Sequence, residues 1–256
     1  MNAPLSSPAE EFNTTWLAAH LERERRQASV LSEIREAIFG AQDGLTSVLA
    51  IVSTVGGATG QPFAVLVAGF AATAAGIFSM AAGEYMSSKS QREIFEAEIA
   101  SEAVEVEERP REAEAEVAYM LQREGLGADS ARRVARELAT SKQVLLKTMV
   151  EKELGLTVDD GSVLRGALVM GAAYGLGGLV PLLPYLFLNV HAAVFVSVAL
   201  AAVTLFCMGA VKSRWTGRGW FVSGLEIFLI GTFAGVAGYF FGTRLPAALG
   251  VAGVSG

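Results

Sequence analysis

The chain has 256 residues, 52% of them hydrophobic, and its mean hydropathy is +0.43. This composition is too apolar for an ordinary soluble domain and favours an integral membrane protein. Residues 87–160 hold 17 acidic and 11 basic side chains, so they carry the whole net charge of −6. Such an acidic segment argues against nucleic acid and favours cations or basic partners, although a solvated helical domain has the same composition.

The first 36 residues are predicted to form a tail followed by a helix. Residues 16–36 alternate apolar and charged side chains. This pattern is typical of an amphipathic helix that lies on the membrane surface or leads straight into a first span.

Five apolar runs follow, each close to the ~20 residues that cross a bilayer. The predicted fold class is an all-α membrane protein with five transmembrane helices and a three-helix cytosolic insert between spans 2 and 3. The runs are approximately 37–58, 62–86, 163–184, 190–211 and 221–243. The predicted domains are 1–36 (tail and amphipathic helix), 37–86 (spans 1 and 2), 87–160 (acidic insert), 161–243 (spans 3 to 5) and 244–256 (C-terminal tail).

The basic residues predict an orientation. Arginines precede the first run, Lys89 and Arg92 follow the second, and Lys212 and Arg214 follow the fourth, whereas the loops after the first and third runs are uncharged. The positive-inside rule then places the N-terminus and residues 87–160 in the cytosol and the C-terminus outside. The Ala- and Arg-rich composition suggests a bacterial inner membrane.

Two ionisable residues fall in the first two apolar runs. Asp43 is costly at membrane depth, by about 3 kcal/mol on insertion scales, and such residues are usually functional. Met80 and Glu84 stand one helical turn apart in the second run. All three side chains offer lone pairs to a cation, and their shared depth predicts a common cation path. Lipid or packing contact for Met80 and an interfacial position for Glu84 are the alternatives.

The acidic insert is predicted to begin with one long helix over 87–122, kinked or broken at Pro110. Seven glutamates and no basic residue lie between Glu93 and Glu108. A bound divalent cation would relieve the repulsion among them, because carboxylates are hard oxygen ligands; a solvated acidic face explains the spacing equally well. The steps between five glutamates keep them on one helix face: Glu98, Glu102, Glu105, Glu112 and Glu116.

Two further helices are predicted at 128–139 and 141–154. Met149 and Glu153 share a face of the last one, being four residues apart. A thioether beside a carboxylate suits a softer divalent ion such as Fe(II) better than calcium or magnesium. A core position in a three-helix bundle is the alternative for Met149.

Three stretches resemble the vacuolar iron transporter family. They are REAIFGAQDGL at 35–45, SMAAGEYMSSKSQ at 79–91 and ELGL at 153–156, and the resemblance covers about residues 35–243. It implies a homodimer of five-span chains that moves Fe(II), and often Mn(II), out of the cytosol in exchange for protons, with no prosthetic group.

The resemblance also implies roles for individual residues. Asp43 and Met80 match the family's translocation path. Ala113, between Glu112 and Glu114, stands where the family has another glutamate. The metal ligands of the family's cytosolic domain match Glu102, Glu105, Glu116, Met149 and Glu153.

These features predict a proton-coupled exporter of Fe(II) or Mn(II), with the bilayer, divalent metal ions and protons as partners and Asp43, Met80 and Glu84 in its path. A membrane-anchored metal sensor or storage module is the alternative. An enzyme is not expected, because the sequence shows no nucleophile–base pair, phosphate loop or histidine cluster.

Overall fold

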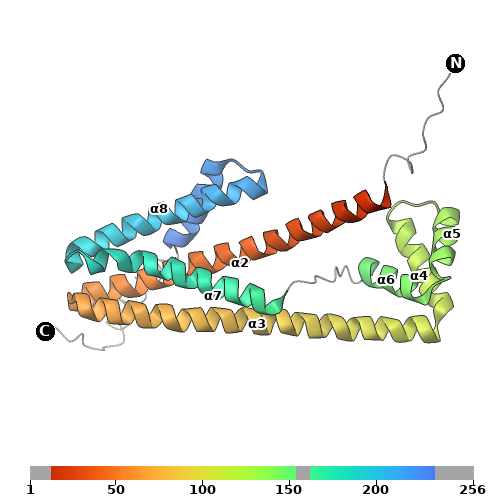
Figure 1. Ribbon diagram of the computed structural model, residues 1–256, viewed down its shortest axis with the longest axis horizontal. Helices are drawn as coiled ribbons and strands as arrows, with labels where there is room; N and C mark the ends of the chain where they lie inside the picture. The colour runs from red at the N-terminus through yellow and green to blue at the C-terminus, as the bar shows by residue number, and fades with distance from the viewer. Residues whose placement is uncertain (1–12, 154–161, 234–256) are drawn as a thin grey trace, which may run out of the picture. The chain divides into compact units, whose positions relative to one another are not determined.

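The computed structural model describes residues 13–153 and 162–233, and this part of the chain is helical and contains no strand. The all-α prediction is confirmed. The elements, shown in Figure 1, are α2 (Thr14–Thr59), α3 (Pro62–Glu108), α4 (Pro110–Arg123), α5 (Ala128–Leu138), α6 (Lys142–Lys152), α7 (Val163–Leu179), the 3-10 helix η1 (Val180–Leu186), α8 (Val190–Thr216) and a last helix Trp220–Phe233.

Within residues 13–153 and 162–233, four segments are long and apolar enough to cross a membrane: α2, α3, α7 with η1, and α8. The amphipathic start of the chain is continuous with the first span, since α2 is a single helix of 46 residues. The predicted fifth span is described only as Trp220–Phe233, an apolar helix of 14 residues. Residues 234–243 of that span and the tail 244–256 lie outside the described residues.

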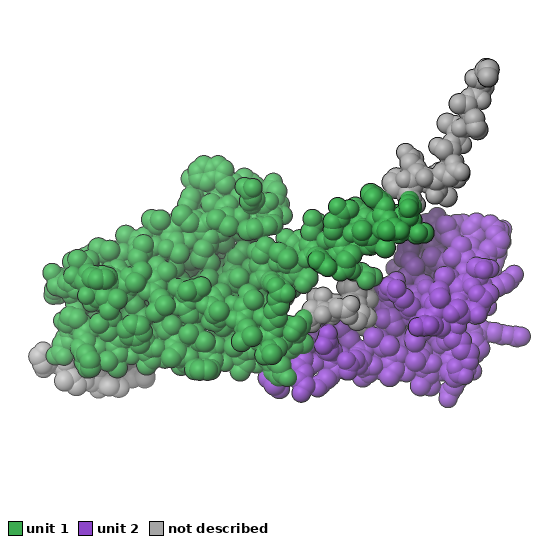
Figure 2. All heavy atoms as spheres, in the orientation of Figure 1, with its two compact units in different colours: residues 1–85, 161–256 green, residues 86–160 purple. Residues whose placement is uncertain are grey.

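The chain divides into two compact units, coloured separately in Figure 2. The first comprises residues 1–85 and 161–256 and contains α2, α7, η1 and α8. The second comprises residues 86–160 and contains α4, α5 and α6. Helix α3 belongs to both units, because it runs on without interruption past residue 85.

In the first unit, α7 lies alongside α2 in unusually close contact (Figure 1). Small residues make this possible, because glycine lets two helix backbones approach closely. A Cβ added at Gly44 would lie 2.1 Å from the Tyr174 carbonyl oxygen, and one at Gly177 would lie 2.1 Å from that of Ala41. Gly40 and Gly44, four residues apart on α2, therefore both lie at the contact with α7.

Gly44→Ala is accordingly expected to destabilise the first unit by about 1–3 kcal/mol, the usual cost of overpacking. The new methyl group meets backbone atoms, so the two helices must separate. The measurement is the melting temperature of the full chain in detergent. Gly83→Ala is the matched control, because a Cβ there has no neighbour within 4 Å. Equal melting temperatures for the two variants would contradict the close approach of α2 and α7.

The second unit is built around a small apolar core. Val106 of α3, Val117 of α4, Ala135 of α5 and Leu145 of α6 are buried together. The break predicted at Pro110 is confirmed: α3 ends at Glu108 and α4 begins at Pro110. The predicted glutamate stripe is therefore wrong as one helix face, because its members are divided between two helices.

Candidate metal sites

The break at Pro110 leaves three of the predicted glutamates close together. One carboxylate oxygen each from Glu105 of α3 and Glu112 and Glu116 of α4 lie within 4.8 Å of one another. Glu112 and Glu116 are one turn apart in α4, which places them on the same face. Ala113 is fully buried in the unit's core, and its other neighbour Glu114 pairs with Arg136 at 3.8 Å. It is Glu112 rather than Glu114 that joins the acidic cluster.

Two more predicted ligands act electrostatically on this cluster. Burial raises the pKa of the Glu102 carboxyl, and Glu153 and Glu105 raise it further. Burial likewise raises the pKa of Glu116, with added repulsion from Glu105 and Glu153. The Glu102 Oε2 atom is buried and has no hydrogen-bond partner among the described residues. Raised pKa values and an unpartnered oxygen both favour a bound proton or cation.

Met149 and Glu98, two further residues singled out in this unit, lie in different surroundings from each other. Met149 is fully buried against the core formed by α3, α4 and α5. It therefore occupies a core position, the alternative named for it from the sequence. Glu98 is exposed on α3. Glu112 is the other exposed member of the predicted stripe, whereas Glu102, Glu105 and Glu116 are half-buried.

A basic residue already neutralises part of the cluster. Arg109, in the break between α3 and α4, lies 3.1 Å from Glu112 and 3.4 Å from Glu105 through its guanidinium nitrogens. A divalent cation at these two carboxylates has to compete with it. Arg109 is four residues after Glu105 and three before Glu112, a spacing at which side chains on neighbouring helical turns pair.

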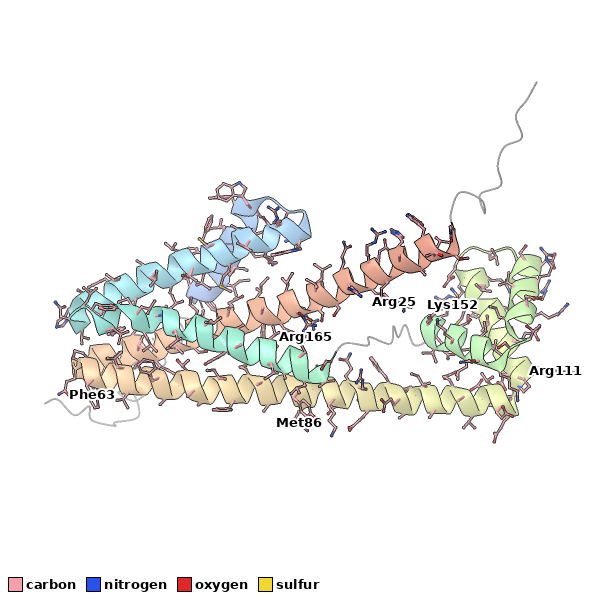
Figure 3. All side chains as sticks on the ribbon, in the orientation of Figure 1. Arg25, Phe63, Met86, Arg111, Lys152 and Arg165 are labelled. Carbon is pink, nitrogen blue, oxygen red and sulfur yellow. The ribbon has the colours of Figure 1, made fainter. Side chains whose placement is uncertain are left out.

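Arg109→Gln is expected to tighten divalent-metal binding by about two- to fivefold, the scale of exposed ion pairs. The measurement is calorimetric titration of the purified full chain with Mn(II). Arg111→Gln removes the same charge two residues away, from the exposed position labelled in Figure 3, and is expected to change the affinity less. Weaker binding in Arg109→Gln would show that Arg109 organises the acids rather than competing for them.

In the first unit, Asp43 is half-buried on α2 and is held by local hydrogen bonds. Its Oδ1 atom accepts a hydrogen bond from Ser47, 3.3 Å away and one turn later. A side-chain hydrogen bond also joins Ser47 to Tyr174 of α7, and Asp43 acts electrostatically on that tyrosine. Tyr174, which sequence reasoning missed, therefore connects the candidate aspartate to a second helix.

The same tyrosine borders α3. A Cβ at Gly76 would lie 2.0 Å from the Tyr174 ring, so the ring lies directly against the α3 backbone. Met80 is one turn after Gly76 and Glu84 one turn after Met80, so the three share a helix face. Met80 and Glu84 are both half-buried. The structure thus brings α2 and the Gly76 turn of α3 against the same tyrosine.

Glu36 is an acidic residue of α2 that, like Tyr174, the sequence analysis did not single out. It is only 8% exposed; Ser32 donates a hydrogen bond to its Oε1 atom, and its Oε2 atom has no partner among the described residues. Gly166 of α7 makes the space, since a Cβ there would lie 2.8 Å from Oε2. Arg165, labelled in Figure 3, pairs with Glu33 at 3.0 Å beside it. No sequence pattern links Glu36 to Gly166, so only the fold reveals this environment.

Glu226, an acidic residue in the last described helix, is accounted for by ion pairs with two basic side chains. Its carboxylate lies 3.8 Å from Lys212 and 3.6 Å from Arg218, and its side chain is 39% exposed. Because its carboxylate is already paired and partly exposed, Glu226 is a weaker candidate than Asp43 for a metal ligand in the membrane.

Comparison with known proteins identifies the family. The model of the VIT family matches residues 34–243. The chain belongs to the VIT family. Vacuolar iron transporter 2 of Oryza sativa subsp. japonica is 34% identical over 232 residues, covering 90% of this chain and 93% of the relative. Vacuolar iron transporter 1 of Eucalyptus grandis is 37% identical over 208 residues, covering 80% and 84%.

A more distant VIT relative, the vacuolar iron transporter of Plasmodium falciparum (isolate 3D7), is 29% identical over 223 residues, covering 83% of this chain and 82% of the relative. The predicted family is confirmed, as is the prediction that the chain is not an enzyme, because the VIT family and these relatives are transporters. Together with the apolar helices, membership in this family establishes an integral membrane protein.

Proposed function

We propose that this VIT-family chain exports Fe(II), Mn(II) or both from the cytosol in exchange for protons. One observation supports the collection of metal most directly: Glu105, Glu112 and Glu116 converge within 4.8 Å in a chain whose relatives are named iron transporters. Three carboxylates at that spacing are a suitable oxygen donor set for a divalent cation.

The second unit collects the metal in this proposal. Glu105, Glu112 and Glu116 provide the first ligands, and Glu102 and Glu153 add negative charge and further oxygens. Because burial and mutual repulsion raise the pKa values of Glu102 and Glu116, these carboxyls retain protons at higher pH than ordinary glutamates. A metal that binds there displaces those protons, so its affinity rises with pH. Met149 packs in the core beneath the site. Its role as a metal ligand rests on the family resemblance alone.

The first unit provides the path. Asp43, Met80 and Glu84 hold the ion during passage, a carboxylate and a thioether being suitable for Fe(II) or Mn(II). Protonation of the carboxylates from the outer side weakens their hold on the metal and returns protons inward. Measuring the metal flux and the proton flux together tests whether Asp43 carries the metal and the proton alternately.

The proposed topology has five spans, with the N-terminus and residues 87–160 in the cytosol and the C-terminus outside. The basic residues that flank the apolar runs support it. A homodimer is part of the proposal and rests on family resemblance. A bacterial inner membrane stays a prediction from composition; the relatives compared are plant and parasite proteins named for vacuoles.

A flux assay tests this function. The full chain is reconstituted in liposomes that enclose a metal-sensitive dye, and Fe(II), Mn(II), Zn(II) and Co(II) are added one at a time under a pH gradient. Uptake of Fe(II) or Mn(II) above that of protein-free liposomes is expected. A sensor or storage module would bind these ions without uptake, and that result would exclude transport.

A further inference from the structure

An apolar groove in the first unit stands apart from the candidate metal sites. It has a volume of about 370 Å³, within the range of small-molecule pockets, and lies between α2 and the end of α8. Leu31, Ile34 and Phe39 of α2 and Trp215 of α8 form its apolar walls. Phe39 is 57% exposed and Trp215 is 47% exposed, so the groove is open at the side.

Two basic side chains also line this groove. Arg35 comes from α2 and Lys212 from α8. Arg35 lies two residues before the first apolar run and Lys212 directly follows the fourth, so both belong at the same predicted membrane boundary. Trp215 is at that level as well, and tryptophan is enriched where hydrocarbon meets headgroups. Apolar walls with cations at the boundary match an acyl chain and an anionic headgroup.

The acidic residues nearby do not cancel this positive charge. Glu226 is shared between Lys212 and Arg218, at 3.8 Å and 3.6 Å, so one carboxylate serves two cations. Glu36 is buried against Gly166 of α7 and offsets part of the charge of Arg35. Glu33 pairs with Arg165. The rim of the groove therefore keeps a net positive charge.

We propose that this groove binds one anionic phospholipid of the surrounding bilayer, with its phosphate between Arg35 and Lys212 and an acyl chain along Ile38 and Phe39. Basic pockets between membrane helices recognise anionic headgroups in this way. A lipid without net charge would use the apolar walls but would offer no net negative charge to the two cations. The proposal is independent of which metal the protein moves.

Native mass spectrometry tests it without a transport assay. The full-length chain in mild detergent is incubated with equal amounts of phosphatidylglycerol and phosphatidylcholine that carry identical acyl chains. We expect bound phosphatidylglycerol to exceed phosphatidylcholine by roughly tenfold or more, because each of two basic side chains near an anionic surface contributes about 1 kcal/mol. A ratio near one in the wild type would overturn the proposal.

Two variants and one control locate the binding. Arg35→Gln with Lys212→Gln is expected to bring the ratio close to one. Arg25→Gln with Arg26→Gln removes the same charge from another part of α2, where Figure 3 labels Arg25, and should leave the ratio unchanged. Thr216→Trp adds bulk to the groove lining without changing charge, and bound phosphatidylglycerol should fall. Equal losses in the charge variant and its control, or full binding in Thr216→Trp, would refute the assignment to this groove.

Discussion

Asp43→Asn is expected to reduce metal flux through reconstituted protein by on the order of 100-fold, while metal binding to the second unit stays unchanged. The amide keeps the size of the side chain and can still accept a hydrogen bond from Ser47. It cannot carry the negative charge that pairs with the passing ion, however. A 100-fold loss corresponds to about 2.8 kcal/mol, less than the roughly 3–5 kcal/mol for breaking a fully buried ion pair, because Asp43 is only half-buried. Dye-loaded liposomes report the flux, and calorimetry of the same preparation reports the binding.

Glu226→Gln is the matched control for this variant. It makes the same acid-to-amide change in the first unit, at a carboxylate that pairs with Lys212 and Arg218. Its flux should stay within about twofold of the wild type, since surface ion pairs contribute little. If the metal flux of Asp43→Asn equals that of Glu226→Gln, Asp43 is not part of the metal path. The transport proposal would then lack its ligand in the first span.

The double variant Glu105→Gln, Glu116→Gln is expected to weaken Mn(II) binding by at least about 10–100-fold, a loss that removal of supporting groups alone can produce at metal sites. These two residues bring carboxylates from α3 and α4 into one cluster, so the change removes donors from both helices. Titration calorimetry of the full chain measures the affinity, and stabilisation by Mn(II) in a thermal melt provides a second readout.

The control for this double variant uses two acids of the same unit that are already paired. Glu107 lies 2.6 Å from Lys142, and Glu124 lies 2.6 Å from Lys152. Glu107→Gln with Glu124→Gln removes the same charge but no cluster donor. If both double variants lose affinity equally, the unit attracts metal through its overall charge and the cluster is not a site.

The sequence allowed the helices and the candidate residues to be predicted, because both depend on local patterns. Apolar runs of about 20 residues indicated the spans, and Pro110 indicated the end of α3. Asp43 and the glutamates were visible as charges whose positions are costly or repulsive. These inferences require only composition and spacing along one helix.

The contacts that assemble the sites could not be predicted in that way. Glu112 joins the cluster because α4 turns back at Arg109. Tyr174 and Glu36 gain their roles from glycines on neighbouring helices, Gly76 and Gly166, that leave space for them. Such pairings depend on which helices pack together, and no spacing within a single run encodes them.

Simultaneous recording of metal and proton movement in one liposome population tests the central claim most directly. The wild-type chain is reconstituted, Fe(II) is added outside, and two enclosed dyes report metal and pH. For chains whose second unit faces outward, Fe(II) entry is expected to be accompanied by proton exit, and an acidic interior should accelerate both. Fe(II) that binds without entering, or entry that is insensitive to the pH gradient, would contradict proton-coupled export.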